Sequence, residues 1–155
     1  MNITSSGAKV AIPFLGVYSA SKSGLEGMSD VVRLELMLFG IDLVMIEPGF
    51  VNTAMYDKGR KEDLSEINQT EYWEAVQNFQ KFIVAEARNN GLSPERLGEA
   101  VHVALTAAKP KARYAVVPQR FKNWTLPRLL PVRMLDAQLA KMLGLTKATK
   151  GGLPS

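Results

Sequence analysis

The sequence contains no cysteine and only one histidine, His102. Disulfides, thiolate nucleophiles and cysteine-ligated zinc are therefore excluded, and one histidine cannot build a metal site by itself. No apolar run approaches the roughly 20 residues of a membrane span, and no signal-peptide pattern follows Met1. We therefore expect a cytoplasmic protein without a metal. We interpret His102 as a residue of a packed helix, because its neighbours are apolar.

Acidic residues are almost missing from the last third of the chain. Residues 109–155 hold 10 Lys or Arg against the single Asp136, a balance of +9. Residues 1–108 hold 9 Lys or Arg against 14 Asp or Glu, a net charge of −5. The length of 155 residues and the hydrophobic content of 46% suit one globular domain. We expect a domain over residues 1–118 and a basic, amphipathic tail over residues 119–155.

The apolar pattern predicts strands that alternate with helices. The run Ile41–Ile46 is almost continuously apolar, as in a central strand of a parallel sheet covered on both faces. Helical periodicity extends over residues 19–39 and 70–89, and Ser93-Pro94 begins a helix that runs to about Ala108. We therefore predict an α/β fold with strands near residues 2–5, 41–46 and 113–117.

Glycines mark two features of the first predicted helix. Gly40 is expected to end it as a C-cap. Gly24 and Gly27 lower its helix propensity, which suggests that another backbone or helix packs closely against it at these positions.

Tyr18 and Lys22 are four residues apart at the start of this helix, so their side chains leave one face about one turn apart. A phenol keeps its proton up to a pKa of about 10, and a nearby ammonium favours the phenolate. Tyr18 is therefore a candidate general acid or base at a hydroxyl or carbonyl oxygen. The alternative is a half-buried tyrosine beside a solvated lysine.

Two further segments accompany this pair. Ser5 lies 13 residues before Tyr18, in a loop that follows the first predicted strand. The second strand ends at Pro48-Gly49 and continues into a loop with Val51 and Thr53. Because ligands of parallel α/β sheets bind beyond the carboxyl ends of the strands, both loops fall where a site is expected.

In this order and spacing, the three segments resemble the second half of a short-chain dehydrogenase/reductase. The resemblance implies that Ser5 hydrogen-bonds the substrate oxygen and that Tyr18 donates or accepts the proton. It implies that Lys22 binds the nicotinamide ribose and favours the phenolate of Tyr18. Ser6 competes for the serine role but lies one residue closer to Tyr18 than the family spacing expects.

The resemblance further implies a cofactor site for NAD or NADP. Pro48, Gly49, Val51 and Thr53 would line the nicotinamide end, with Thr53 reaching the carboxamide. The substrate would be a small-molecule alcohol or carbonyl compound. The helix that carries Tyr18 would contribute to a homo-oligomer, because the matching helix of the family forms part of a dimer interface.

The glycine-rich turn that holds the cofactor pyrophosphate in such proteins has no counterpart here. We therefore expect the carboxy-terminal half of a Rossmann-like, doubly wound parallel sheet with flanking helices and a basic amphipathic tail. An alternative is a catalytically incompetent chain whose surfaces only associate. Another is an epimerase or dehydratase, although the Pro-Gly-x-Val-x-Thr loop favours the reductase.

Residues 54–92 allow two interpretations. The helix predicted over residues 70–89 carries an apolar and aromatic stripe that either packs on its own domain or forms a lid over the substrate. A lid of this composition would favour an apolar substrate, such as a steroid, a retinoid or a long-chain alcohol.

The tail places large apolar residues and Trp124 among arginines and lysines, and we predict a helix over residues 132–143. Such a segment either packs against its own domain or a partner subunit, or makes a peripheral contact with an anionic membrane surface. We expect no nucleic acid as a partner, because the tail matches none of the usual modules.

Overall fold

The computed structural model describes residues 1–56 and 65–146. Its sheet contains three parallel strands, β1 (Asn2–Ile3), β2 (Met45–Pro48) and β3 (Arg113–Val116), in the order β1-β2-β3. Ile3 pairs with Ile46, and Ile46 pairs with Tyr114. The predicted parallel α/β fold is therefore confirmed.

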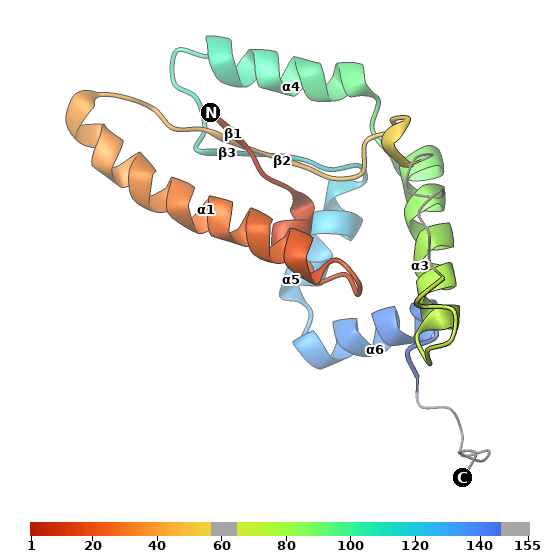
Figure 1. Cartoon of the computed structure of the whole chain (residues 1–155). Helices are drawn as coiled ribbons and strands as arrows, with labels where there is room; N and C mark the ends of the chain where they lie inside the picture. Colours follow the sequence, from red (N-terminus) through yellow and green to blue (C-terminus); the bar gives the residue numbers. More distant parts are fainter. Residues whose placement is uncertain (57–64, 147–155) are drawn as a thin grey trace.

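Helices cover both faces of this sheet. Helix α1 (Gly16–Leu36) lies on one side of the strands and helix α4 (Pro94–Thr106) on the other (Figure 1). The apolar core lies between the sheet and α4, and its members come from both: Val44, Ile46, Ala104, Leu97, Val101, Tyr114 and Val116. Such double coverage explains why the strands read as apolar runs.

The face toward α1 combines the apolar Met45 with charged side chains, because successive side chains of a strand alternate between the faces. Glu47 of β2 and Arg113 of β3 form an ion pair there. Arg113 also lies 2.8 Å from Glu26 and 2.6 Å from Asp30, both on α1. Lys9 adds a fourth contact, 2.7 Å from Glu26. This ionic cluster joins the helix that carries Tyr18 to the two strands.

All three predicted strands differ from the observed ones, the third only because it ends at Val116 rather than at residue 117. The second strand is Met45–Pro48, so Pro48 ends the strand, and residues 41–44 precede it. The first strand is two residues long, although the N–H of Thr4 still donates to the carbonyl of Ile46 at 2.8 Å. Strand bounds depend on the pairing partner, which the sequence of one strand does not contain.

Helix α1 begins at Gly16 rather than Ser19 and continues into a short 3₁₀ turn, η2 (Met37–Phe39). Gly40 caps this turn with φ of 67°, as predicted. The predicted close packing at Gly24 and Gly27 is wrong within the described chain, because no atom lies within 4 Å of a Cβ built there. The apolar face of α1 is therefore partly uncovered.

The predicted helix of residues 70–89 consists of α3 (Trp73–Ala85) and one π-helical turn, η3 (Glu86–Asn90). Ser93 caps α4 as predicted, since its hydroxyl accepts the N–H of Arg96. Residues 57–64, which precede α3, lie outside the described residues.

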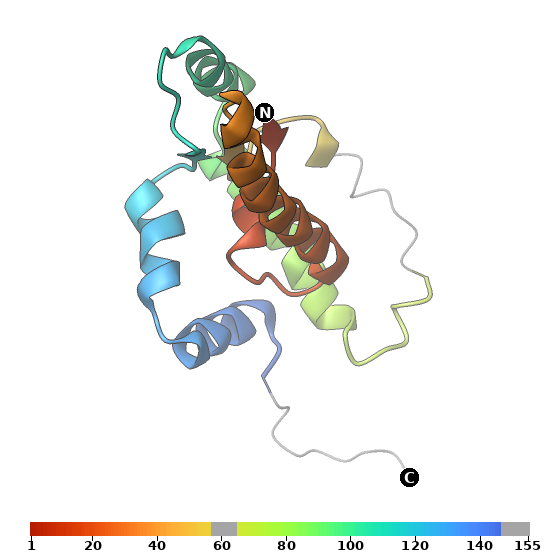
Figure 2. The same ribbon diagram turned by 90° about the vertical axis from the view of Figure 1, so that its left-hand side faces the viewer.

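Beyond β3 the chain forms η4 (Phe121–Thr125), α5 (Leu126–Leu129) and α6 (Val132–Leu143), which agrees with the helix predicted over residues 132–143. The turned view shows these elements as one continuous path along the side and base of the molecule (Figure 2). The division between residues 118 and 119 stays a prediction.

Candidate active site

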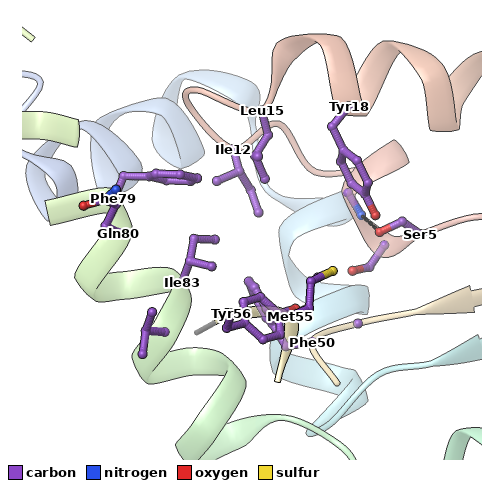
Figure 3. A pocket seen from close by; sticks show the side chains of 14 residues that line it. Ser5, Ile12, Leu15, Tyr18, Phe50, Met55, Tyr56, Phe79, Gln80 and Ile83 are labelled. Carbon is purple, nitrogen blue, oxygen red and sulfur yellow. Dashed lines mark hydrogen bonds between the residues drawn. The ribbon is translucent and has the colours of Figure 1, made fainter. Parts of the chain in front are cut away.

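Ser5 and Tyr18 face each other across Gly7 (Figure 3). Ser5 is buried, follows β1 and caps the 3₁₀ turn η1 (Ser6–Ala8), because its Oγ accepts the N–H of Gly7 at 3.1 Å. A Cβ at Gly7 would lie 3.3 Å from Cε1 of Tyr18 and 3.5 Å from Oγ of Ser5. Glycine therefore lets the phenol approach the serine. The hydroxyl hydrogen of Ser5 remains available for another acceptor.

Lys22 lies one turn along α1 from Tyr18. Its Nζ donates to the backbone carbonyl of Ile3 at 3.2 Å and lies 5.9 Å from the ring centroid of Tyr18. The spacing of four residues thus brings the ammonium beside the phenol ring, as predicted. The same hydrogen bond ties the start of α1 to β1.

Ser5 and Tyr18 open onto a cavity of about 590 Å³. Most of its wall is apolar or aromatic, contributed by Ile12, Leu15, Phe50, Met55, Phe79, Ile83 and Val84. The polar side chains on its wall are those of Ser5, Ser6, Tyr18, Tyr56 and Gln80. A mostly apolar hollow with a few polar groups is typical of a small-molecule site, since the polar groups orient a ligand and the apolar wall removes it from water.

The Pro-Gly loop divides between two places. Gly49 lines the cavity, and its N–H donates to the carbonyl of Val116 at 2.9 Å. Val51 forms an isolated bridge with Leu92, and Pro48 is part of β2. Thr53 is exposed and lines a second hollow, of about 450 Å³, with Asn52, Ala54 and Arg88. The structure therefore brings Gly49 to Ser5 and Tyr18 but not Thr53.

Tyr56 is a member of the cavity wall that the sequence did not indicate. Burial raises the pKa of its phenol, the negative charge that Tyr18 can carry raises it further, and a hydrogen bond from the backbone of Val51 opposes both. Its ring also contacts Phe50, with centroids 6.3 Å apart. The only signal in the sequence is its place three residues after Thr53, in the loop beyond a strand end.

The sheet, the helices on both of its faces and the site at the strand ends define a Rossmann-like α/β protein. The family model described as short chain dehydrogenase matches residues 1–64. The chain belongs to the short-chain dehydrogenase/reductase family. The resemblance stated from Ser5, Tyr18, Lys22 and the Pro-Gly loop is thereby confirmed at the level of the family.

Two bacterial relatives illustrate the similarity. The NADPH-dependent 3-dehydrocapnine reductase of Ornithobacterium rhinotracheale is 36% identical over 136 residues, which are 88% of this chain and 47% of that protein. The 3-ketodihydrosphingosine reductase of Bacteroides thetaiotaomicron is 35% identical over 145 residues, 90% of this chain and 51% of that protein. The chain thus spans about half the length of these relatives.

A more distant relative and one solved structure are also similar to this chain. Human 17-beta-hydroxysteroid dehydrogenase type 1 is 34% identical over 131 residues, 81% of this chain and 36% of that protein. The crystal structure of a short-chain dehydrogenase from Streptomyces avermitilis aligns with a TM-score of 0.61 at 24% identity, over 93% of this chain and 50% of that one. The structural likeness concerns the fold.

Proposed function

We propose that the complete protein is an NAD(P)-dependent oxidoreductase that transfers hydride between a nicotinamide cofactor and a carbonyl or secondary alcohol of an apolar substrate. The observation that carries this proposal is the convergence of Ser5 and Tyr18 on one largely apolar cavity. The names of the relatives support it, since they are reductases and dehydrogenases.

In the direction of reduction, the hydroxyl of Ser5 donates to the substrate oxygen while its Oγ accepts from Gly7. Tyr18 then gives its proton to the developing alkoxide, and the ammonium of Lys22 stabilises the phenolate that remains. When bound, the nicotinamide cofactor supplies the hydride. In the direction of oxidation, Tyr18 takes the proton from the alcohol.

Gly49 on the cavity wall and Lys22 beside Tyr18 fit the nicotinamide end of the cofactor. Gly49 presents backbone without a side chain to the cavity, and a Cβ there would lie 3.2 Å from Cδ of Pro118. Lys22 supplies a donor beside Tyr18. We assign Pro48, Gly49, Val51 and Thr53 to the cofactor loop, with either NAD or NADP as the cofactor.

The cavity wall favours an apolar substrate, because its aromatic and aliphatic side chains desolvate a hydrocarbon ligand. Two relatives are named for apolar compounds, 3-ketodihydrosphingosine and a 17-beta-hydroxysteroid. A substrate of this kind partitions into membranes, so the protein would act in the cytoplasm at or near a membrane surface.

The uncovered face of α1 supports a homo-oligomer. Met28, Val31 and Leu34 are 55%, 56% and 59% exposed along that helix. Three large apolar side chains on one exposed helix are typical of a contact surface. The same observation supports the alternative that this chain by itself only associates and does not catalyse.

Titration of the 155-residue chain with NADH and with NADPH, followed by cofactor fluorescence, tests the proposal. We expect saturable binding of at least one cofactor by the native chain and by Tyr18→Phe, which keeps the ring. Turnover of an apolar ketone should be lost in Tyr18→Phe alone. A chain that binds neither cofactor up to millimolar concentration would leave association as its function.

A further inference from the structure

The C-terminal segment, residues 119–146, is attached to the domain by a small set of inward contacts. Trp124 is 5% exposed and Leu143 is fully buried. The amide of Asn78 on α3 donates to the carbonyl of Leu143 at 3.4 Å, and the amide of Asn123 donates to that of Pro118 at 2.9 Å. The segment therefore packs against its own domain, one of the two arrangements that the sequence allowed.

Its outward side nevertheless exposes large apolar side chains. Phe121 is 71% exposed, Leu129 and Val132 are each 73% exposed, and Met134 is 58% exposed. On α6 the leucines at 135, 139 and 143 recur at steps of four and face inward, which leaves Arg133, Met134 and Lys141 on the exposed side. Packing on the domain thus accounts for only one side of these helices.

The exposed surface of the segment is also strongly basic. All five basic residues of the segment are exposed: Arg120, Lys122, Arg128, Arg133 and Lys141. Asp136 is its one acidic residue, so residues 119–146 carry a net charge of +4. Arg128 lies over the ring of Trp124, with its Cζ 4.8 Å from the centroid, and remains exposed.

The combination of exposed apolar and exposed basic side chains indicates which kind of partner this face binds. A second copy of this face would bring two charges of +4 together, which is repulsive. No helix within residues 1–56 and 65–146 is long and apolar enough to cross a membrane. Exposed aromatic and aliphatic side chains among basic ones match a surface that is apolar inside and anionic outside.

We propose that the outward side of the C-terminal segment binds the surface of an anionic lipid bilayer. The basic residues contact the headgroups, and Phe121, Leu129 and Val132 enter the boundary with the acyl chains. Each Lys or Arg near such a surface contributes about 1 kcal/mol, and each buried apolar side chain adds to this.

The C-terminal segment also contacts a helix that forms part of the cavity wall. Helix α3 carries Asn78, which binds the C-terminal segment, and also Phe79 and Ile83, which line the cavity. Figure 1 shows α6 beside the amino-terminal end of α3.

Cosedimentation of the chain with vesicles tests the proposal. Vesicles of phosphatidylcholine with about one third phosphatidylserine should bind the chain, and vesicles of phosphatidylcholine alone should bind it far less. The double variant K122E/R133E should bind at least about 30-fold more weakly, because two favourable contacts of about 1 kcal/mol each are lost. Phe121→Ser should also weaken binding without a change in thermal unfolding.

The matched control is K109E/K111E, which makes the same change of charge on two exposed lysines at the far end of β3. It should bind vesicles nearly as the native chain does. Equal loss in both double variants, or no sedimentation with anionic vesicles, would overturn the proposal. So would self-association without vesicles that K122E/R133E abolishes, since the face would then bind protein. The vesicle assay contains no cofactor, so a failed NAD(P)H titration would not change the interpretation of the binding to vesicles.

Discussion

The guanidinium of Arg113 on strand β3 lies 2.8 Å from the buried carboxylate of Glu26 on helix α1. The residues are 87 positions apart in the sequence, and their contact holds the helix that carries Tyr18 against the sheet. Glu47 of β2 shares the same guanidinium and is also buried. Two buried carboxylates therefore share one guanidinium, which makes Arg113 the residue to test first.

Arg113→Met should lower the free energy of unfolding by an amount near the lower end of about 3–5 kcal/mol. Removing one partner leaves buried charge without compensation, although Lys9 still contacts Glu26. Chemical denaturation followed by circular dichroism measures the change. Arg96→Met is the matched control, because Arg96 and Glu99 form an exposed pair, and it should leave stability nearly unchanged. Equal losses in the two variants would contradict this account.

Stability should fall in acid as Glu26 takes up a proton. Burial alone would raise the pKa of this carboxyl, but hydrogen bonds from Lys9 and Arg113 outweigh burial and lower the pKa below 4.5. The unfolded chain therefore binds this proton at a higher pH than the folded chain does. The stabilisation is fully present above pH 4.5 and is lost as the pH falls through the folded pKa.

Urea unfolding of the native chain and of Glu26→Gln, measured from about neutral pH to about pH 3, tests this dependence. We expect a shallower loss of stability with falling pH in Glu26→Gln, because that residue no longer titrates. Glu35→Gln is the control on the same helix, since Glu35 is exposed. It should retain the native slope. An unchanged slope in Glu26→Gln would exclude Glu26 as the source.

Replacing Gly91 and Gly98 with alanine should change the stability of the protein in opposite directions. A Cβ at Gly91 would overlap the backbone oxygen of Ala87 and lie 3.1 Å from the N of Asn52, so Gly91→Ala should destabilise by about 1–3 kcal/mol or more. Gly98 lies inside α4 with nothing within 4 Å, so Gly98→Ala should stabilise by about 0.5–1 kcal/mol. Thermal melting of both variants compares them, and changes of the same sign would refute the close approach at Gly91.

The phenol of Tyr56 should ionise above pH 10.0, because burial and the negative charge of Tyr18 both raise its pKa. Titration of tyrosine absorbance in the native chain and in Tyr56→Phe isolates this group by difference. Tyr18→Phe should move the pKa of Tyr56 back toward 10.0 without reaching it, since burial remains. A difference spectrum that titrates at or below pH 10.0 would place Tyr56 outside the cavity wall.

Local features were predictable because they depend on residues close together in the sequence. The cap at Ser93, the left-handed Gly40 and the helix of residues 132–143 each follow from short-range chemistry and periodicity. Tyr18 and Lys22 approach each other for the same reason, since one helical turn separates them. The family likewise followed from short segments at fixed spacing.

Contacts between distant segments were decided by tertiary structure. Periodicity marks residues as apolar but cannot say whether a neighbour covers them, so Gly24 and Gly27 are open where close packing was predicted. Tyr56 lies on the cavity wall and Thr53 does not, because Val51 bridges with Leu92 and this contact with a distant segment sets the path of the loop.

The sequence by itself determined the kinds of element, their caps and the Tyr-Lys pair, because each arises from interactions within a few residues of the chain. The tertiary structure decided that Arg113 forms ion pairs with Glu26, Glu47 and Asp30 at once. It also decided which wall of the cavity is apolar. Burial and charge pairing depend on which distant residues the fold brings within a few ångströms, and spacing along one chain does not contain that information.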